Sequence, residues 1–72
     1  MNIEEFLVQM QDVLQTDAAL TKETVLDELD EWDSLSIMAT MAFLDKNFGV
    51  KTVIGDYRGM STIGDIAAKA GL

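Results

Sequence analysis

Cysteine and histidine are both absent from this chain of 72 residues. Without cysteine the chain has no disulfide framework and no thiol of its own to act as a nucleophile. Without either residue, hydrolytic triads that use a histidine base and the common zinc sites are excluded. The sequence therefore lacks two of the residue types that enzymes most often use as nucleophile, base or metal ligand.

Long apolar runs are missing too. No run approaches the roughly 20 residues that a bilayer-spanning helix needs, and no signal-peptide pattern opens the chain, so we expect a cytoplasmic protein. Apolar residues nevertheless make up 49% of the sequence, with a mean hydropathy of +0.15. Disordered chains are poor in such residues, so the composition predicts a folded globule. We expect one small domain spanning residues 1–72.

Basic residues are scarce in the first half of the chain. Residues 1–33 carry ten acids and one base, whereas residues 34–72 carry three acids and four bases, so the net charge of −8 comes from the first half. Six acids lie just before Ser34: Glu23, Asp27, Glu28, Asp30, Glu31 and Asp33. Such a field repels nucleic acid and anionic membranes and attracts basic protein surfaces. Simple solvation of the segment is the alternative.

Apolar spacing predicts a helix over residues 2–15, with Asn2 as its cap and Glu5 three positions on. Residues 16–33 are expected to form a long ordered loop with room for a helical turn. Four apolar side chains would hold this loop against the core: Leu20, Val25, Leu26 and Leu29.

A second helix is predicted from Ser34 to Phe48, capped by Asp33 and ended by Gly49. Its inward stripe would consist of Leu35, Met38, Met41, Ala42 and Leu44, with Phe48. Ile37 and Phe43 lie off the centre of that stripe, so we expect apolar surface there. That surface would serve as a contact site or be half-buried by a loop.

The residue pattern in the last third of the chain predicts mostly helix. Residues 50–54 are β-branched and alternate, but they have no partner strand and are expected to form an extended linker. Residues 55–60 would contain a short helix. A last helix should begin near Thr62, which has capping-box spacing to Asp65, and stop at Gly71. Its expected buried residues are Ile63, Ile66, Ala67 and Ala70. The fold class is therefore all-α, a small helical bundle with a long first loop.

Two chemistries for Ser34 and the acids before it fail on sequence. An EF-hand that starts at Asp27 would need an oxygen ligand at Leu29, and one that starts at Asp30 would need it at Trp32. A serine hydrolase would need a base, but the G-x-S-x-G context and histidine are absent. Ser34 is then either an ordinary first-turn residue or the carrier of a phosphate-linked group, which a helix N-terminus favours.

The sequence Asp33-Ser34-Leu35 opens the second helix after a long loop, and Phe48-Gly49-Val50 and Thr62-Ile63 follow at later element boundaries. This combination resembles the acyl carrier protein family over essentially the whole chain. The resemblance implies a four-helix bundle with a short third helix. It also implies that a phosphopantetheinyl transferase attaches 4′-phosphopantetheine from coenzyme A to Ser34. Asp33 would cap the helix and help orient the transferase and its metal, and Leu35 would pack behind the site.

The chain departs from the pattern of fatty-acid-synthesis carriers, whose second helix is strongly acidic. Here Asp45 is the only acid between Ser34 and Phe48, and Glu31-Trp32 precede Asp33. We therefore expect partner enzymes with basic surfaces to dock on the loop, through Asp27, Asp30 and Glu31. Apolar contacts would come from Ile37, Met38 and Phe43. Trp32 is predicted to be a hydrophobic plug rather than a cargo contact.

The Trp-Asp-Ser-Leu form is similar to discrete carriers of specialised acyl, aminoacyl or polysaccharide-modifying pathways. The resemblance implies a monomer, not itself an enzyme, that carries thioester-bound acyl groups between acyl-loading and acyl-transferring enzymes. Three alternatives stay open: a peptidyl or D-alanyl carrier with aminoacyl cargo, a carrier-like module that is never modified, and an acidic adaptor that binds regardless of Ser34. The scaffold does not record cargo or pathway.

Overall fold

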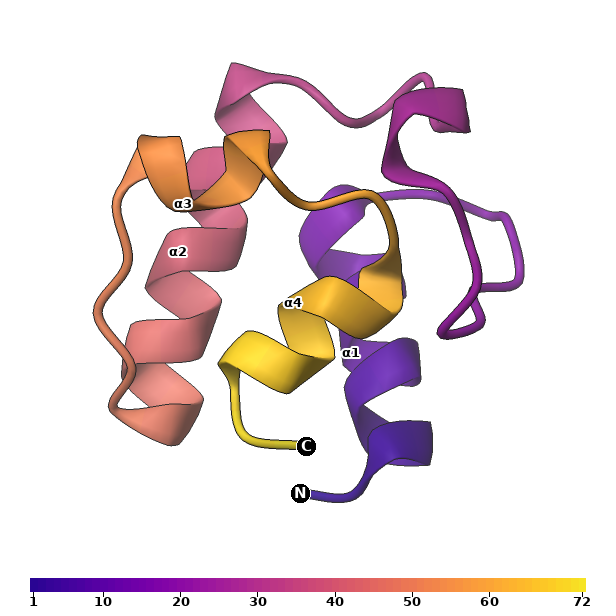
Figure 1. The fold of residues 1–72 in the computed structure, drawn as a ribbon. Helices are drawn as coiled ribbons and strands as arrows, with labels where there is room; N and C mark the ends of the chain where they lie inside the picture. The colour runs from indigo at the N-terminus through magenta and orange to yellow at the C-terminus, as the bar shows by residue number, and fades with distance from the viewer.

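The computed structural model describes all residues from Met1 to Leu72, which form four α-helices and one 3-10 turn (Figure 1). In chain order the elements are α1 (Ile3–Leu14), the 3-10 turn η1 (Leu26–Glu28), α2 (Ser34–Phe48), α3 (Ile54–Arg58) and α4 (Ile63–Lys69). Helices α1 and α2 pack together, and α3 packs on α2. Both termini lie at the end of the bundle opposite the start of α2. The predicted all-α fold class is confirmed.

The predicted caps explain where the two outer helices begin. The side chain of Asn2 accepts a hydrogen bond from the Glu5 amide at 2.8 Å, and Glu5 accepts one from the Asn2 amide at 3.4 Å. At α4 the Thr62 hydroxyl accepts from the Asp65 amide at 3.3 Å, and Asp65 accepts from the Thr62 amide at 3.1 Å. Each pair satisfies amides that a helix start leaves free.

One apolar core joins the four helices. Its fully buried large apolar side chains come from α1, η1, α2 and α4: Phe6, Met10, Leu26, Leu44, Ile63 and Ile66. The ring of Phe6 lies 5.9 Å from that of Phe43 and 6.1 Å from that of Phe48, between ring centres. Each fully buried side chain of this kind stabilises the fold by about 1.5–3 kcal/mol, which a chain of this size needs.

The long loop is ordered because its backbone bonds to the start of α4. The Leu26 amide donates to the Ser61 carbonyl at 2.9 Å, and the Gly64 amide donates to the Lys22 carbonyl at 2.8 Å. Leu20 and Leu26 are buried as predicted and Leu29 is half-buried, but Val25 is exposed. The expected ordered loop with one helical turn is therefore confirmed.

The predicted inward stripe of α2 is right in one half and wrong in the other. Leu44 is buried, and Met41 and Phe48 pack on the core as predicted. The other three residues, Leu35, Met38 and Ala42, are exposed. Leu35 is 77% exposed and Met38 is 55% exposed, whereas Phe43 is buried. The buried residues of α2 are Ser36, Thr40, Phe43 and Leu44, and Ile37, Met41 and Phe48 pack on the core beside them. The buried Thr40 hydroxyl donates to the Ser36 carbonyl at 2.8 Å, so its burial leaves no unpaired polar atom.

The segment between α2 and α4 follows its prediction. Helix α2 ends at Gly49, which has a φ of 67°, a left-handed conformation that glycine adopts without strain. Residues 50–53 contain no strand and lead to the short α3. In α4, Ile63, Ile66 and Ala67 are buried and Ala70 is half-buried. None of the helices has the length and apolar character that crossing a membrane would require.

Candidate functional site

Ser34 is the first residue of α2, and its side chain is exposed. Its hydroxyl makes no hydrogen bond within the chain, and the amides of Ser34 and Leu35 have no intramolecular acceptor. These amides belong to the first turn, where the helix ladder has not yet begun and the positive end of the dipole lies. A free hydroxyl thus sits beside two free N–H donors, a setting that stabilises an anion bonded to its oxygen.

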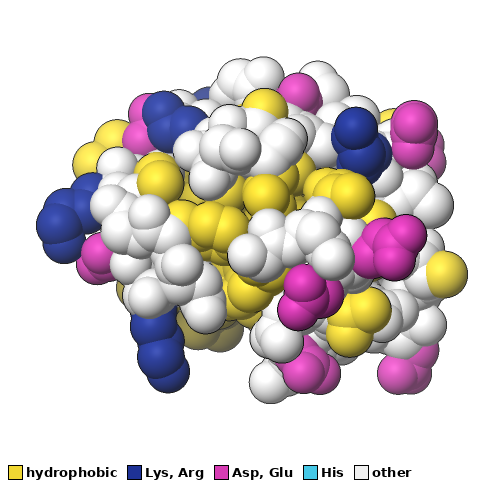
Figure 2. Space-filling model, turned by 90° about the horizontal axis from the view of Figure 1, so that it is seen from below, with side chains coloured by type: hydrophobic (Ala, Val, Ile, Leu, Met, Phe, Trp, Pro, Cys, Tyr) yellow, Lys and Arg dark blue, Asp and Glu magenta, His cyan; other side chains and the backbone are white.

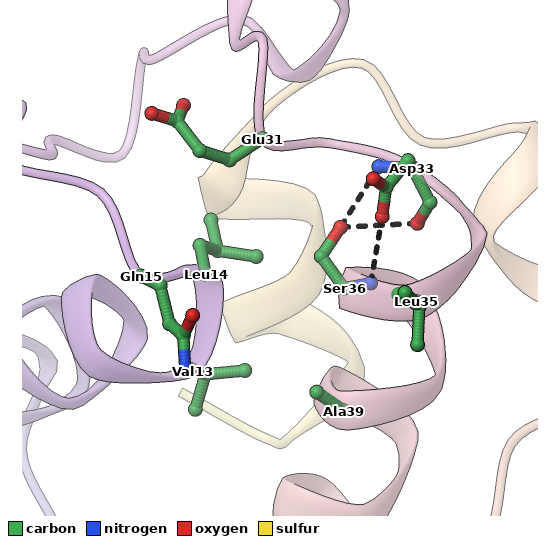
Figure 3. A pocket seen from close by; sticks show the side chains of 8 residues that line it. All are labelled: Val13, Leu14, Gln15, Glu31, Asp33, Leu35, Ser36 and Ala39. Carbon is green, nitrogen blue, oxygen red and sulfur yellow. Dashed lines mark hydrogen bonds between the residues drawn. The ribbon is translucent and has the colours of Figure 1, made fainter.

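Asp33 and Ser36 hold the first turn of α2 in place. The Ser36 amide donates to the Asp33 carboxylate at 3.0 Å, and the Asp33 amide donates to the Ser36 hydroxyl at 2.8 Å. The Ser36 hydroxyl donates in turn to the Asp33 carbonyl at 3.0 Å (Figure 3). Asp33 is the predicted cap, but the part of Ser36 was missed. The three-residue spacing of Asp-x-x-Ser was the available signal, since it allows reciprocal capping.

We expected Leu35 to pack behind the site, but it does not. It is the most exposed of the large hydrophobic residues in the chain, and Met38 stands exposed on the same helix. Ile37 is half-buried and packs on the core, and Phe43 belongs to the core. Of the three predicted apolar contact residues, Met38 alone is exposed.

The acidic loop carries unpaired charge. Asp27 and Asp30 are exposed and Glu31 is half-buried. The single salt bridge of the chain, Lys51–Asp45 at 3.3 Å, lies towards the other end of α2. Seen from the end that holds the termini, most acidic side chains lie on the α1 side and most basic ones on the α2 side (Figure 2). No three acidic side chains converge as a metal site would require.

Trp32 lies just before the cap and is half-buried. Its ring centre is 6.2 Å from that of Tyr57 in α3, and it packs against the core, as expected of a plug.

Burial raises the pKa of Tyr57, a hydrogen bond from Thr52 lowers it, and the nearby Asp56 raises it. Tyr57 therefore stays neutral and anchors the linker through the 2.8 Å contact of its hydroxyl with Thr52.

A groove of about 420 Å³ opens beside the first turn of α2 (Figure 3). We call it the α1–α2 groove. Its lining comes from the end of α1 (Val13, Leu14 and Gln15), from the loop (Glu31 and Asp33) and from α2 (Leu35, Ser36 and Ala39). No sequence pattern indicated this groove, because its lining comes from the end of α1, the end of the long loop and the start of α2.

No family model and no curated protein matches this chain. Among solved structures, it is similar to the solution NMR structure of a holo acyl carrier protein from Geobacter metallireducens. The TM-score is 0.74 and the sequence identity 28%, over 94% of this chain and 79% of that one. The chain therefore has an acyl-carrier-protein-like fold.

Proposed function

We propose that this protein is an acyl carrier that bears 4′-phosphopantetheine on Ser34 and shuttles thioester-bound acyl groups between biosynthetic enzymes. The observation that carries the proposal is the exposed, unbonded hydroxyl of Ser34 at the first turn of α2. Its support is the fold, which is similar to that of an acyl carrier protein solved in the holo form.

The residues around Ser34 suit a phosphodiester. Coenzyme A would supply the group. The Ser34 oxygen would attack the phosphorus that bears the pantetheine arm, and adenosine 3′,5′-bisphosphate and the hydroxyl proton would be released. The product is an anion at a helix start, where the free amides of Ser34 and Leu35 can donate to it. The arm, when bound, supplies the thiol that forms thioesters and that this cysteine-free chain lacks.

The chain's own part in the reaction is to hold the hydroxyl outward. The reciprocal bonds between Asp33 and Ser36 fix the first turn and leave Ser34 between two residues whose backbone is pinned. A transferase can then reach the hydroxyl without opening the fold. This makes the protein a substrate and carrier rather than a catalyst, in keeping with its fold.

Partner enzymes would contact two surfaces next to Ser34. The exposed acids Asp27 and Asp30 keep their full field because no base pairs with them, and this field steers basic surfaces towards the site. Leu35 and Met38 offer an apolar patch on α2. Exposed apolar side chains that lie together often mark contact sites. Docking would thus combine steering by the loop with apolar contact on α2.

The test is to incubate the protein with coenzyme A, Mg²⁺ and a broad-specificity phosphopantetheinyl transferase and to measure its intact mass. We expect a gain of one phosphopantetheine, absent in Ser34→Ala. If the folded and initially unmodified protein gains nothing, the carrier proposal fails. An interaction module or acidic adaptor would then be the better account, and binding of its partner would survive Ser34→Ala.

A further inference from the structure

One aromatic side chain holds the end of the long loop to the body of the fold. Between Leu29 and Ser36 the chain contains two apolar residues, Trp32 and Leu35. Leu35 is 77% exposed, whereas Trp32 is half-buried and packs against the core. The Trp32 amide also donates to the Leu29 carbonyl at 3.1 Å, so this residue is held by both its backbone and its side chain. Trp32 is therefore the apolar anchor of the residues that lead into α2.

The ring against which Trp32 packs is itself fixed. The ring centres of Trp32 and Tyr57 lie 6.2 Å apart and their planes are tilted by 55°, an arrangement typical of aromatic pairs. Tyr57 is only 3% exposed, and its hydroxyl contacts that of Thr52 at 2.8 Å. It lies in α3, which packs on α2 near the end that begins at Ser34 (Figure 1). Tyr57 thus gives Trp32 a rigid surface.

The hydrogen bonds next to Ser34 fix the first turn of α2 only relative to its own helix. Every hydrogen bond of Asp33 and Ser36 stays within α2 and its cap. The ends of helices commonly fray, because few bonds hold the first turn. The side chain that ties the loop end to another element is that of Trp32, one residue before the cap. Loss of this contact would free the loop end to pull the cap open.

Resting on the proposed function, we propose that Trp32 is a positioning residue for the modification of Ser34. By packing on Tyr57 it fixes the direction in which the loop enters α2. It thereby keeps the Asp33 cap closed and holds the Ser34 hydroxyl in the conformation that the transferase binds. Trp32 acts through the backbone of Asp33, since its own side chain is half-buried and lies against α3.

The first test measures opening of the first turn by amide hydrogen exchange in the unmodified protein. The Ser36 amide donates to the Asp33 carboxylate at 3.0 Å, so its protection reports the closed cap. We expect Trp32→Ala to lower this protection about two- to tenfold, the equilibrium factor that corresponds to one aromatic pair. Trp32→Phe keeps an aromatic ring and should restore most of the protection. If Trp32→Ala does not fold, Trp32→Leu replaces it, with the same expected direction.

Phe48→Ala is the matched control. Phe48 is also half-buried and packs on two other rings, and it ends the helix that Ser34 begins. Its replacement removes aromatic contacts from the core but should leave the protection of the Ser36 amide unchanged. Urea unfolding measures the stability of both variants, so that a general loss of stability is separated from local opening of the cap.

The second test follows loading of the carrier by a phosphopantetheinyl transferase at saturating coenzyme A. A first turn that is ordered for only part of the time binds the transferase more weakly, because the apparent affinity falls with the competent fraction. Trp32→Ala should therefore raise the KM for the carrier at least twofold and leave kcat unchanged. Trp32→Phe should return KM towards the parent value. Phe48→Ala should leave both constants unchanged, and so should Tyr57→Phe, which keeps the ring and loses only the contact with Thr52.

The outcomes separate this inference from the function on which it rests. Unchanged Ser36 protection in Trp32→Ala, or an equal loss in Phe48→Ala, would overturn the inference. A parent-like KM in Trp32→Ala, or a loss confined to kcat, would overturn it as well. If the parent protein gains no phosphopantetheine, the proposed function has failed, and the role of Trp32 in loading fails with it. The exchange measurement needs no transferase and then decides only whether Trp32 keeps the cap closed.

Discussion

Replacing Ser36 by alanine should destabilise the protein, whereas replacing Ser34, two residues earlier, should not. Both are serines in the first turn of α2, but their surroundings differ. Ser36 is only 8% exposed, and its hydroxyl takes part in two hydrogen bonds with the Asp33 backbone. The Ser34 hydroxyl takes part in none. The pair therefore separates a serine that is bonded into the fold from one whose hydroxyl is free.

The magnitude follows from the bonds that are lost. In Ser36→Ala the Asp33 carbonyl keeps the bond from the Ile37 amide at 2.9 Å, but the Asp33 amide loses its acceptor. An amide left unpaired in a partly buried site costs about 1–3 kcal/mol, and the better helix propensity of alanine offsets about 0.5 kcal/mol. We expect the free energy of unfolding to fall by about 1 kcal/mol and Tm by about 4–8 °C.

Urea unfolding and thermal unfolding, followed by circular dichroism, measure the stability of both variants. Ser34→Ala should stay within about 0.5 kcal/mol of the parent protein, as surface changes usually do. Intact mass after incubation with transferase and coenzyme A should show the opposite pattern. Ser36→Ala should still gain one phosphopantetheine, because its attachment serine is intact, and Ser34→Ala should gain none.

Equal stability of Ser36→Ala and the parent would refute the capping geometry described for α2. Loss of stability in Ser34→Ala similar to that in Ser36→Ala would show that the Ser34 hydroxyl is engaged in the fold rather than free. Modification of Ser34→Ala would move the attachment to another serine, and Ser36 and Ser61 would then be tested in turn.

Three further predictions concern the loop and α4. Charge reversal of Asp30 and Glu31 to lysine should slow phosphopantetheine loading by the transferase about tenfold at low salt, and the difference should shrink as salt is added. Glu4→Lys, on α1, is the control. An unchanged loading rate would mean that these acids only form a solvated face. Gly64→Ala should lower the free energy of unfolding by about 1–3 kcal/mol, because its Cβ would lie 2.8 Å from the Lys22 carbonyl oxygen. Gly55→Ala, where a Cβ meets no atom within 4 Å, should instead raise it by about 0.4–1 kcal/mol in urea unfolding, and equal effects would contradict the close approach at Gly64. Hydrogen bonds from the amides of Ser61 and Thr62 lower the pKa of Asp65 in the folded protein. The unfolded state therefore binds the proton more tightly, and the free energy of unfolding should fall as the pH drops through that lowered pKa. In Asp65→Asn this part of the acid dependence of Tm should disappear.

The sequence predicted the helix starts well because capping is local. Asn2 and Thr62 each meet a partner three residues on, so spacing alone identifies the cap. The bounds of α2 followed for the same reason, from Asp33 at one end and Gly49 at the other. The fold class then came from the number and order of such elements.

The exposed position of Leu35 and Met38 and the burial of Ser36 and Thr40 were not predictable from hydrophobicity. Apolar residues surround most of this helix, so no single face is marked by composition. Ser36 and Thr40 are polar and were not among the predicted core residues, yet each bonds to the backbone of its own helix turn and can be buried at little cost. The α1–α2 groove was hidden for another reason, since its shape depends on the path of residues 16–33 between the two helices.

The exposure of Leu35 and Met38 bears on function. A helix that buries serine and threonine while exposing Leu35 and Met38 gives up apolar burial that the small core would otherwise gain. Consistency between sequence pattern and fold commonly breaks down at functional sites, where stability is not the only requirement. Here the break lies directly beside Ser34, since Leu35 is its neighbour in sequence and Met38 follows one helix turn later. Two of the residues that hydrophobicity assigned to the core, Leu35 and Met38, therefore form the apolar surface that we propose for partner contact.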